Sequence, residues 1–323
     1  MAQPWGLFIL FALVLALLCV WGGVLTALQA FKPPRKYFAW ALATGRPKDP
    51  SDLGLTFQEI TCASGQQHPL PAWRISGRAI HANAPILVML HGWGRSRWDS
   101  LTRIEPFQTV CSEIVLIDLP AHGEHAGARS GLGVSEPECV AHALQDIAHQ
   151  FPNRPFILAG HSMGAGIAIR AANLLDQAAT DFKHNALDKE RISIAGVIAF
   201  AAYSTLRSPI PARLAMQKLP TWPFAPIALL MLRIFGRMDR PLELDARQLR
   251  SPLLVIAGDS DPISPLVDAR KIAAAAPQGT LLTLPYQRHD DLRLGDDEKF
   301  DRALREFLKS ITASSVATHE SLS

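Results

Sequence analysis

The chain has 323 residues, of which 48% are hydrophobic and 19% charged, and its formal net charge is +3. This apolar content excludes an intrinsically disordered chain, and four cysteines are too few for a disulfide-held scaffold. A near-neutral charge balance gives no sign of nucleic-acid binding, which needs concentrated positive charge. None of the 32 Lys and Arg or 29 Asp and Glu residues precedes Lys32, so residues 1–31 carry no charged side chain.

Residues 1–31 are predicted to form a transmembrane anchor. The run from Trp5 to Phe31 is apolar and has no polar face, and about 20 such residues in a helix cross a hydrocarbon core of about 30 Å. A cleaved signal peptide is the alternative. Against it, no basic residue precedes the run, the run is long, and no A-x-A cleavage site follows. We therefore expect a single-pass N-terminal anchor.

Residues just after the anchor predict its orientation. Lys32, Arg35 and Lys36 follow the apolar run, and the positive-inside rule then favours the cytoplasmic side for the rest of the chain. The cysteines agree, because those outside the run are odd in number, which suits a reducing compartment. They are Cys62, Cys111 and Cys139.

The remaining chain alternates apolar runs with helix-like stretches. Residues 32–54, rich in Pro, Gly and charge, are expected to be a linker with a short helix at 37–43. Strands are expected at 55–62, 70–75, 85–90, 114–117, 156–158, 194–200, 253–256 and 280–284, and helices at 136–150, 163–176 and 296–309. This alternation predicts a mostly parallel sheet with helices on both faces. The Ser/Thr/Ala-rich tail, 312–323, is expected to be disordered.

A long insertion, residues 204–250, separates two of these strands. It is apolar and aromatic, and no acidic residue precedes Asp239 within it, whereas five basic residues do: Arg207, Arg213, Lys218, Arg233 and Arg237. Long insertions in compact domains are usually lids or binding loops, which favours a helical cap over a site. A helical excursion packed on the main domain and a surface resting on anionic lipid remain alternatives.

The strongest motif is Gly160-His161-Ser162-Met163-Gly164, which fits G-x-S-x-G between an apolar strand and a helix. A serine at a sharp strand-to-helix turn needs small neighbours, because the backbone folds back tightly there. The amides at the helix N-terminus then stabilise negative charge. The context therefore predicts that Ser162 is a nucleophile.

A serine nucleophile needs a base, which in turn needs an orienting carboxylate. His289 follows the last predicted strand and precedes the last helix, as the base does in the order serine, acid, histidine. The acid is open on residue type and spacing alone. The candidates are Asp259, Asp261, Asp290 and Asp291, and each of them could instead be a turn or cap residue.

An oxyanion hole requires two backbone N–H donors near the serine. Met163, directly after the nucleophile, is expected to supply one. The loop His91-Gly92-Trp93-Gly94, after strand 85–90, is expected to supply the other. His91, Gly92 and His161 flank these donors and are expected to contact the substrate.

On these residues the chain resembles the α/β-hydrolase family, and among its branches the lipase/esterase-type enzymes with a cap after the sixth strand. The resemblance covers about residues 55–308. It is carried by HGWG (91–94), DLPAHGEH (118–125), GHSMG (160–164), GDSDPISP (258–265) and His289. It implies an α/β-hydrolase domain at 55–311, with Ser162 as nucleophile, Asp261 as acid and His289 as base. The family's oxyanion donors correspond to Trp93 and Met163.

The expected function is that of a membrane-anchored serine hydrolase cleaving carboxylic esters, hydrophobic or lipid-like in the acyl part. Acyl transfer or thioester cleavage on the same triad is one alternative, and a non-catalytic binding protein of the same fold is another. We expect no cofactor and no metal, because the histidines and glutamate at 122–125 lack further ligands nearby. Expected partners are an ester substrate and the membrane, without nucleic acid.

Overall fold

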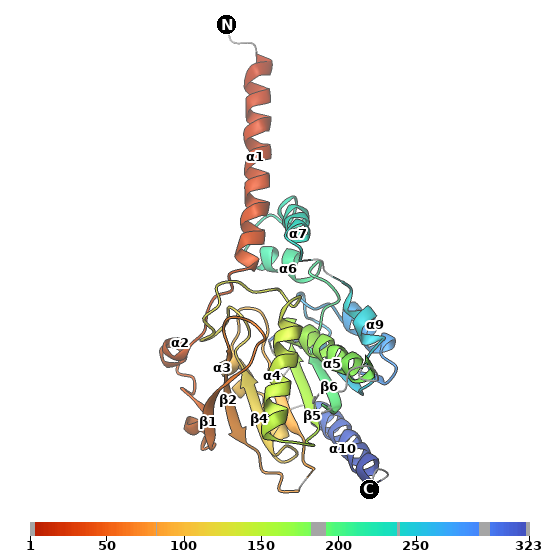
Figure 1. Ribbon diagram of the computed structural model, residues 1–323. Coiled ribbons are helices and arrows are strands. Elements are labelled where there is room, and N and C mark those ends of the chain that lie inside the picture. Colours follow the sequence, from red (N-terminus) through yellow and green to blue (C-terminus); the bar gives the residue numbers. More distant parts are fainter. Residues whose placement is uncertain (1–3, 82, 182–191, 238–239, 291–297, 321–323) are drawn as a thin grey trace.

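An eight-stranded sheet in the order β1-β2-β4-β3-β5-β6-β7-β8 forms the centre of the protein. The computed structural model describes residues 4–81, 83–181, 192–237, 240–290 and 298–320 (Figure 1). The strands are β1 Phe57–Cys62, β2 Leu70–Ser76, β3 Ile86–Leu90, β4 Glu113–Ile117, β5 Phe156–His161, β6 Ile194–Phe200, β7 Leu253–Gly258 and β8 Gly279–Leu284. β2 pairs antiparallel with both β1 and β4, and every other pair is parallel. The predicted mostly parallel sheet is thereby confirmed.

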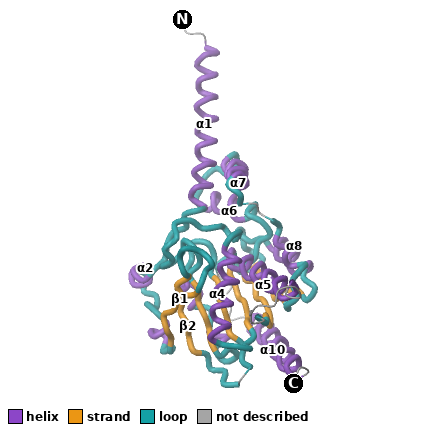
Figure 2. Tube along the Cα trace, in the orientation of Figure 1, coloured by secondary structure: helices purple, strands orange, loops and turns teal. Residues whose placement is uncertain are grey.

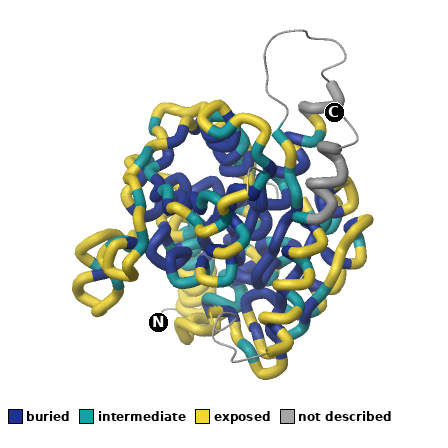
Figure 3. The backbone as a smooth tube through the Cα atoms, turned by 90° about the horizontal axis from the view of Figure 1, so that it is seen from below, coloured by how far each residue is buried: buried dark blue, intermediate teal, exposed yellow. Residues whose placement is uncertain are grey.

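Helices cover both faces of the sheet, which explains why the central strands are apolar without alternation. They are α2 Phe38–Ala43, α3 Arg97–Leu101, α4 Glu136–Gln150, α5 Met163–Asp181, α8 Leu242–Ala246, α9 Leu266–Ala275 and α10 Glu298–Glu320, with 3₁₀ turns at Pro50–Leu53 and Glu105–Phe107. In β3, Val88 shares a core with α4, α5, α8 and α9, whereas Leu87 and Met89 share the opposite core with α3 and α10. Figure 2 shows strands flanked by helices, and Figure 3 shows the buried segments gathered in the middle of the domain.

Helix α1, Pro4–Ala30, projects away from the domain (Figure 1). It is long and apolar enough to cross a membrane, and only 6% of its most apolar 18-residue stretch is buried. Its last turns are different, because Ala27 is fully buried and Phe31 is 9% exposed against the domain. Most of the helix is therefore apolar and exposed, whereas its C-terminal end packs against the domain.

The predicted insertion leaves the sheet after β6 and returns before β7. It contains α6 Pro209–Met216, α7 Phe224–Ile234 and the short α8. α7 packs along the lower part of α1 (Figure 1). A third hydrophobic cluster joins the end of α1 to α6 and α7; its buried members are Ala27, Phe31, Leu132, Leu206, Ile210, Leu214, Ala225, Ala228 and Leu232. The insertion thus packs between the end of α1 and the loops that follow the sheet.

The segment predicted as a linker, residues 32–54, is held against the domain along its length. The Arg35 guanidinium donates to the carbonyl of His125 at 2.8 Å. Lys36 forms an ion pair of 3.0 Å with the buried Asp99. The short helix expected at 37–43 is present as α2. These contacts fix the end of α1 relative to the domain.

The structure of the tail differs from the expectation of disorder. α10 continues through residue 312 as far as Glu320, where the described residues end. The stretch from Thr312 to Glu320 contains no Gly or Pro, so nothing in it stops a helix that is already formed. Composition alone pointed to a loose tail because it ignores the helix to which the tail is joined.

Candidate active site

The candidate catalytic residues lie at the carboxyl ends of four parallel strands. Ser162 follows β5, Asp261 lies in the loop after β7, and His289 lies in the loop after β8. The loop 91–94 follows β3, which pairs with β5. Because parallel strands end at the same edge of a sheet, residues far apart in sequence meet there.

The turn at Ser162 has the strained geometry expected of a nucleophile between a strand and a helix. Ser162 has a φ of +57°, in the left-handed region. A side chain at Gly160 would collide with the backbone of Gly164, and one at Gly164 would collide with the carbonyls of Leu90 and His91. The Ser162 N–H donates to the carbonyl of Phe200 at 2.8 Å, which ties the turn to β6. The two glycines of the motif are therefore sterically required.

A chain of hydrogen bonds connects the three candidate residues. His289 Nε2 lies 2.9 Å from Ser162 Oγ, and His289 Nδ1 lies 2.7 Å from Asp261 Oδ2. Asp261 Oδ1 accepts the N–H groups of Ile263 at 2.8 Å and Ser264 at 3.0 Å. Because a carboxylate only accepts, we assign the His289 proton to Nδ1, which leaves Nε2 to accept from the serine hydroxyl. All three side chains are buried, which strengthens these bonds.

The geometry separates the candidate acids that the sequence left open. Asp259 is exposed and accepts from the Tyr286 N–H at 2.7 Å, as a turn residue does. Asp290 forms an ion pair of 2.5 Å with Arg95. Asp291 lies outside the described residues. Of the described candidates, only Asp261 contacts His289 through its carboxylate.

Both expected oxyanion donors lie beside Ser162. Met163 is the first residue of α5, where backbone amides have no partner within the helix and the helix dipole is positive. Gly92 and Trp93 line the same cavity as Ser162. A Cβ at Gly92 would come within 3.2 Å of the Ser162 Cβ, so a side chain there would crowd the loop against the nucleophile.

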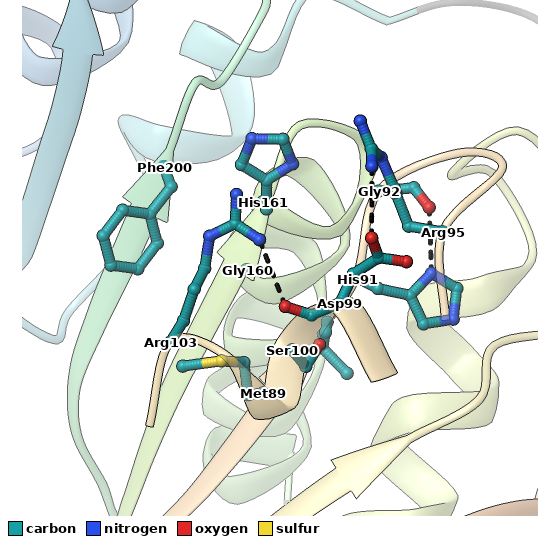
Figure 4. A pocket seen from close by; sticks show the side chains of 11 residues that line it. Met89, His91, Gly92, Arg95, Asp99, Ser100, Arg103, Gly160, His161 and Phe200 are labelled. Carbon is teal, nitrogen blue, oxygen red and sulfur yellow. Dashed lines mark hydrogen bonds and ion pairs between the residues drawn. The ribbon is translucent and has the colours of Figure 1, made fainter. Parts of the chain in front are cut away.

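His161 and His91 hold the loops around the site. His161 Nε2 donates to the backbone carbonyl of His289 at 2.8 Å. His91 Nδ1 donates to the Gly92 carbonyl at 2.9 Å, and His91 Nε2 accepts from the Leu119 N–H at 3.0 Å. Figure 4 shows both rings at a small internal pocket with Arg95 and Asp99. Gly92 and His161 also line the cavity at Ser162, whereas His91 does not, because its ring is bonded behind the loop.

Burial keeps these two histidines neutral. It lowers the pKa of His91 to about 4 and lowers that of His161 well below its ordinary value. Protonating His91 would also turn Nε2 from an acceptor into a donor facing the Leu119 N–H.

Acidification should therefore destabilise the protein. A histidine whose pKa is lower in the folded state binds its proton mainly after unfolding, so stability is complete above pH 6.5 and falls as the pH drops toward 4. For His91 alone the loss reaches about 3 kcal/mol at pH 4. Thermal unfolding in detergent micelles between pH 8 and 4.5 should show a falling midpoint below pH 6.5. His81→Gln, at an exposed histidine, should leave the slope unchanged. A midpoint that is flat or rises on acidification would contradict this account.

Two cavities of different character meet at Ser162. One, of about 80 Å³, is mostly apolar and runs under the cap; its lining includes Met163, Leu206, Ile210, Leu214 and three residues of α1. The other, of about 280 Å³, contains the polar side chains of Lys36, Arg95, Arg213, His289 and Asp290. The candidate nucleophile thus stands between an apolar and a polar compartment.

Arg213 lines both cavities and was not expected at the site. It comes from α6 and lies over the Trp93 ring at 4.5 Å from the ring centroid. Burial lowers the pKa of its guanidinium, which nonetheless stays charged at neutral pH. Its only signal in the sequence was the general excess of basic residues in the insertion. Among the described residues, no group of three or more His, Cys, Asp or Glu could hold a metal ion.

Comparisons with known proteins agree with this architecture. Residues 87–308 match the Alpha/beta hydrolase family. The esterase Pf2001 of Pyrococcus furiosus is similar in structure, with a TM-score of 0.65 and 19% identity, covering 87% of this chain and 98% of its own. A bacterial membrane phospholipase A has a TM-score of 0.57 and 18% identity, covering 95% of this chain and 97% of its own. A putative lipase of Acinetobacter baumannii has a TM-score of 0.58 and 14% identity, covering 82% of this chain and 94% of its own. No match was found among curated proteins.

Proposed function

The chain belongs to the alpha/beta hydrolase family, and from this premise we propose that it is a membrane-anchored serine hydrolase that cleaves carboxylic esters of hydrophobic acids. The observation that carries the proposal is the hydrogen-bonded series of Ser162, His289 and Asp261 at the end of the sheet. A binding protein would have no need of a buried serine aligned with a histidine and an orienting carboxylate.

The proposed reaction follows from this geometry. Ser162 Oγ attacks the carbonyl carbon of the ester while His289 Nε2 takes the hydroxyl proton. The negative oxygen faces the N–H groups of Trp93 and Met163. Collapse of this intermediate breaks the ester bond, and His289 gives its proton to the leaving alcohol. Water, deprotonated by His289, then attacks the acyl-enzyme and releases the acid and free Ser162.

The two cavities favour a hydrophobic acyl group. The cavity under the cap has an apolar lining, so it suits the hydrocarbon part of the substrate. The wider cavity, which contains the polar side chains of Lys36, Arg95 and Arg213, suits the alcohol part of the substrate. Similar structures include proteins named as an esterase, a lipase and a membrane phospholipase A, which supports an ester substrate for this chain.

The anchor is part of the proposal. The exposed apolar length of α1 favours insertion into a bilayer. Removal of α1 as a signal peptide would strip the hydrophobic cluster around Ala27 and Phe31 and expose the cap, so we propose that it is retained. Lys32, Arg35 and Lys36 favour a cytoplasmic catalytic domain. The three cysteines outside α1 are buried and free, which fits a reducing compartment.

A panel of p-nitrophenyl esters from butyrate to palmitate tests the proposal. The full chain is assayed in the membrane fraction that survives an alkaline carbonate wash. We expect kcat/KM to rise at least about tenfold from the butyryl to the dodecanoyl ester, because buried methylenes contribute binding free energy.

Four outcomes would contradict parts of the proposal. Activity released by the carbonate wash would exclude the anchor. A flat or falling chain-length profile would exclude the hydrophobic acyl preference. Failure of Ser162 to react with a fluorophosphonate would favour the non-catalytic alternative. Transfer of the acyl group to an added alcohol, in place of free acid, would favour an acyltransferase.

A further inference from the structure

The apolar cavity at Ser162 is walled on one side by the end of the membrane helix. Thr26, Gln29 and Ala30 of α1 line it together with Ser162 and Met163. The opposite wall comes from the cap, chiefly α6. A helix that acts only as a tether has no reason to share a cavity with the nucleophile.

A hydrogen bond joins the end of α1 to the loop 91–94, which contains the expected oxyanion donor Trp93. The indole N–H of Trp93 donates to the carbonyl of Ala30 at 2.8 Å. Carbonyls in the last turn of a helix have no partner within the helix, so this bond satisfies one of them. The next residue, Phe31, accepts the Ser130 N–H at 2.9 Å and packs edge-on against Phe235 of the cap. This wall of the cavity is therefore held in place.

Close packing against the cap also holds α1 one helical turn before the cavity. A side chain at Gly22 would collide with the Phe224 ring, and one at Gly23 would collide with the Ile227 side chain, both of α7. The hydroxyl of Thr26 donates to the Gly22 carbonyl at 2.8 Å, so its proton needs no acceptor in the cavity. The cavity wall is thus compatible with a hydrocarbon chain.

The surroundings of α1 beyond the cavity are apolar and exposed. Trp21 is 62% exposed and Leu18 is 55% exposed on α1. Leu230 and Ile234 on the neighbouring α7 are 54% and 64% exposed. In a membrane, these exposed apolar groups would face lipid hydrocarbon.

We propose that the end of α1 is a specificity-determining wall of the acyl-chain site, and that the acyl chain of a membrane lipid ester lies against Thr26 and Ala30 when its carbonyl group is at Ser162. The inference rests on the proposed esterase function and adds the substrate class, an ester with one long acyl chain supplied by the bilayer. The helix then both anchors the enzyme in the membrane and determines which acyl-chain lengths the enzyme accepts.

Filling the wall tests the inference. Thr26→Trp should lower kcat/KM for the palmitoyl ester by about tenfold or more relative to kcat/KM for the butyryl ester. Leu28→Trp is the matched control, because Leu28 lies on the same helix, is 45% exposed and does not line the cavity. It should change neither value. Equal losses for both esters, no loss for either, or the same effect from Leu28→Trp would overturn the inference.

A second measurement does not depend on a bulky variant folding. A fluorophosphonate with a long alkyl chain ending in a diazirine reacts with Ser162 of the full chain in vesicles, and light then crosslinks the chain end. We expect crosslinks to peptides of α1 or to vesicle lipid. Crosslinks confined to α4 and α5 would overturn the inference while the labelled serine still upheld the esterase. An unlabelled Ser162 would overturn the proposed function itself, and the inference with it.

Discussion

Replacing Ser162 by alanine should reduce ester hydrolysis about 10⁴- to 10⁶-fold while leaving the protein folded. The hydroxyl supplies the attacking oxygen, and its bond to His289 Nε2 is its only side-chain contact with the other candidate catalytic residues. Alanine keeps the Cβ, so the backbone with φ +57° meets the same steric limits as before. The residual rate should come from substrate binding and the oxyanion donors, which the substitution leaves in place.

The Ser162→Ala measurement is made on full-length protein with the dodecanoyl ester and with a fluorophosphonate probe. Ser260→Ala is the matched control, since Ser260 is exposed and its hydroxyl donates to the side chain of its neighbour Asp259. The control should keep its activity and its labelling. A Ser162→Ala protein that retains more than about 1% of the activity would mean that another group is the nucleophile.

The fold was readable from the sequence because its strands are buried on both faces. A strand such as β3 contacts one core through Val88 and the other through Leu87, so every residue is apolar and the run stands out. The nucleophile turn was readable for a different reason. Gly160 is required by its contact with the backbone of Gly164, four residues later, and such a local requirement leaves a local pattern. Gly164 is required by the carbonyls of Leu90 and His91, which follow from the pairing of β3 with β5.

The acid could not be chosen from residue type and spacing, because Asp259 and Asp261 lie in the same short turn. Asp259 and Asp261 are two residues apart, and their side chains point in different directions. Which of them meets His289 also depends on the path of the loop after β8, which carries the histidine. The resemblance to the family favoured Asp261, and the hydrogen-bond geometry agrees with it. Sequence spacing carries no comparable information about direction.

The contribution of α1 to the cavity had no sequence signal. The hydrogen bond between Trp93 and Ala30 joins residues 63 positions apart. No sequence motif contains both residues, so the sequence did not predict their contact. An apolar segment of this length indicates a membrane helix whether its end is docked or free. The excess of basic residues in the cap indicated a special surface, but it did not identify Arg213 as the residue that lies over Trp93.

Asp261→Asn should lower kcat by roughly 10³- to 10⁴-fold with little change in KM. Asp261 Oδ1 accepts the N–H groups of both Ile263 and Ser264, so the amide oxygen of asparagine will take that place. The amide nitrogen then occupies the position of Oδ2 and presents a donor to His289 Nδ1. This favours the tautomer with its proton on Nε2, which cannot accept the proton of Ser162.

The rival aspartates provide matched controls for this effect. Asp259→Asn alters a turn that bonds Tyr286, and Asp290→Asn removes an ion pair with Arg95, so each should change kcat by less than about fivefold. Steady-state kinetics of the three variants on one ester gives the comparison. A larger loss in Asp259→Asn or Asp290→Asn than in Asp261→Asn would assign the acid to that residue. The predicted order holds because Asp261 alone of the three bonds the His289 ring, and the orientation of that ring controls the proton of Ser162.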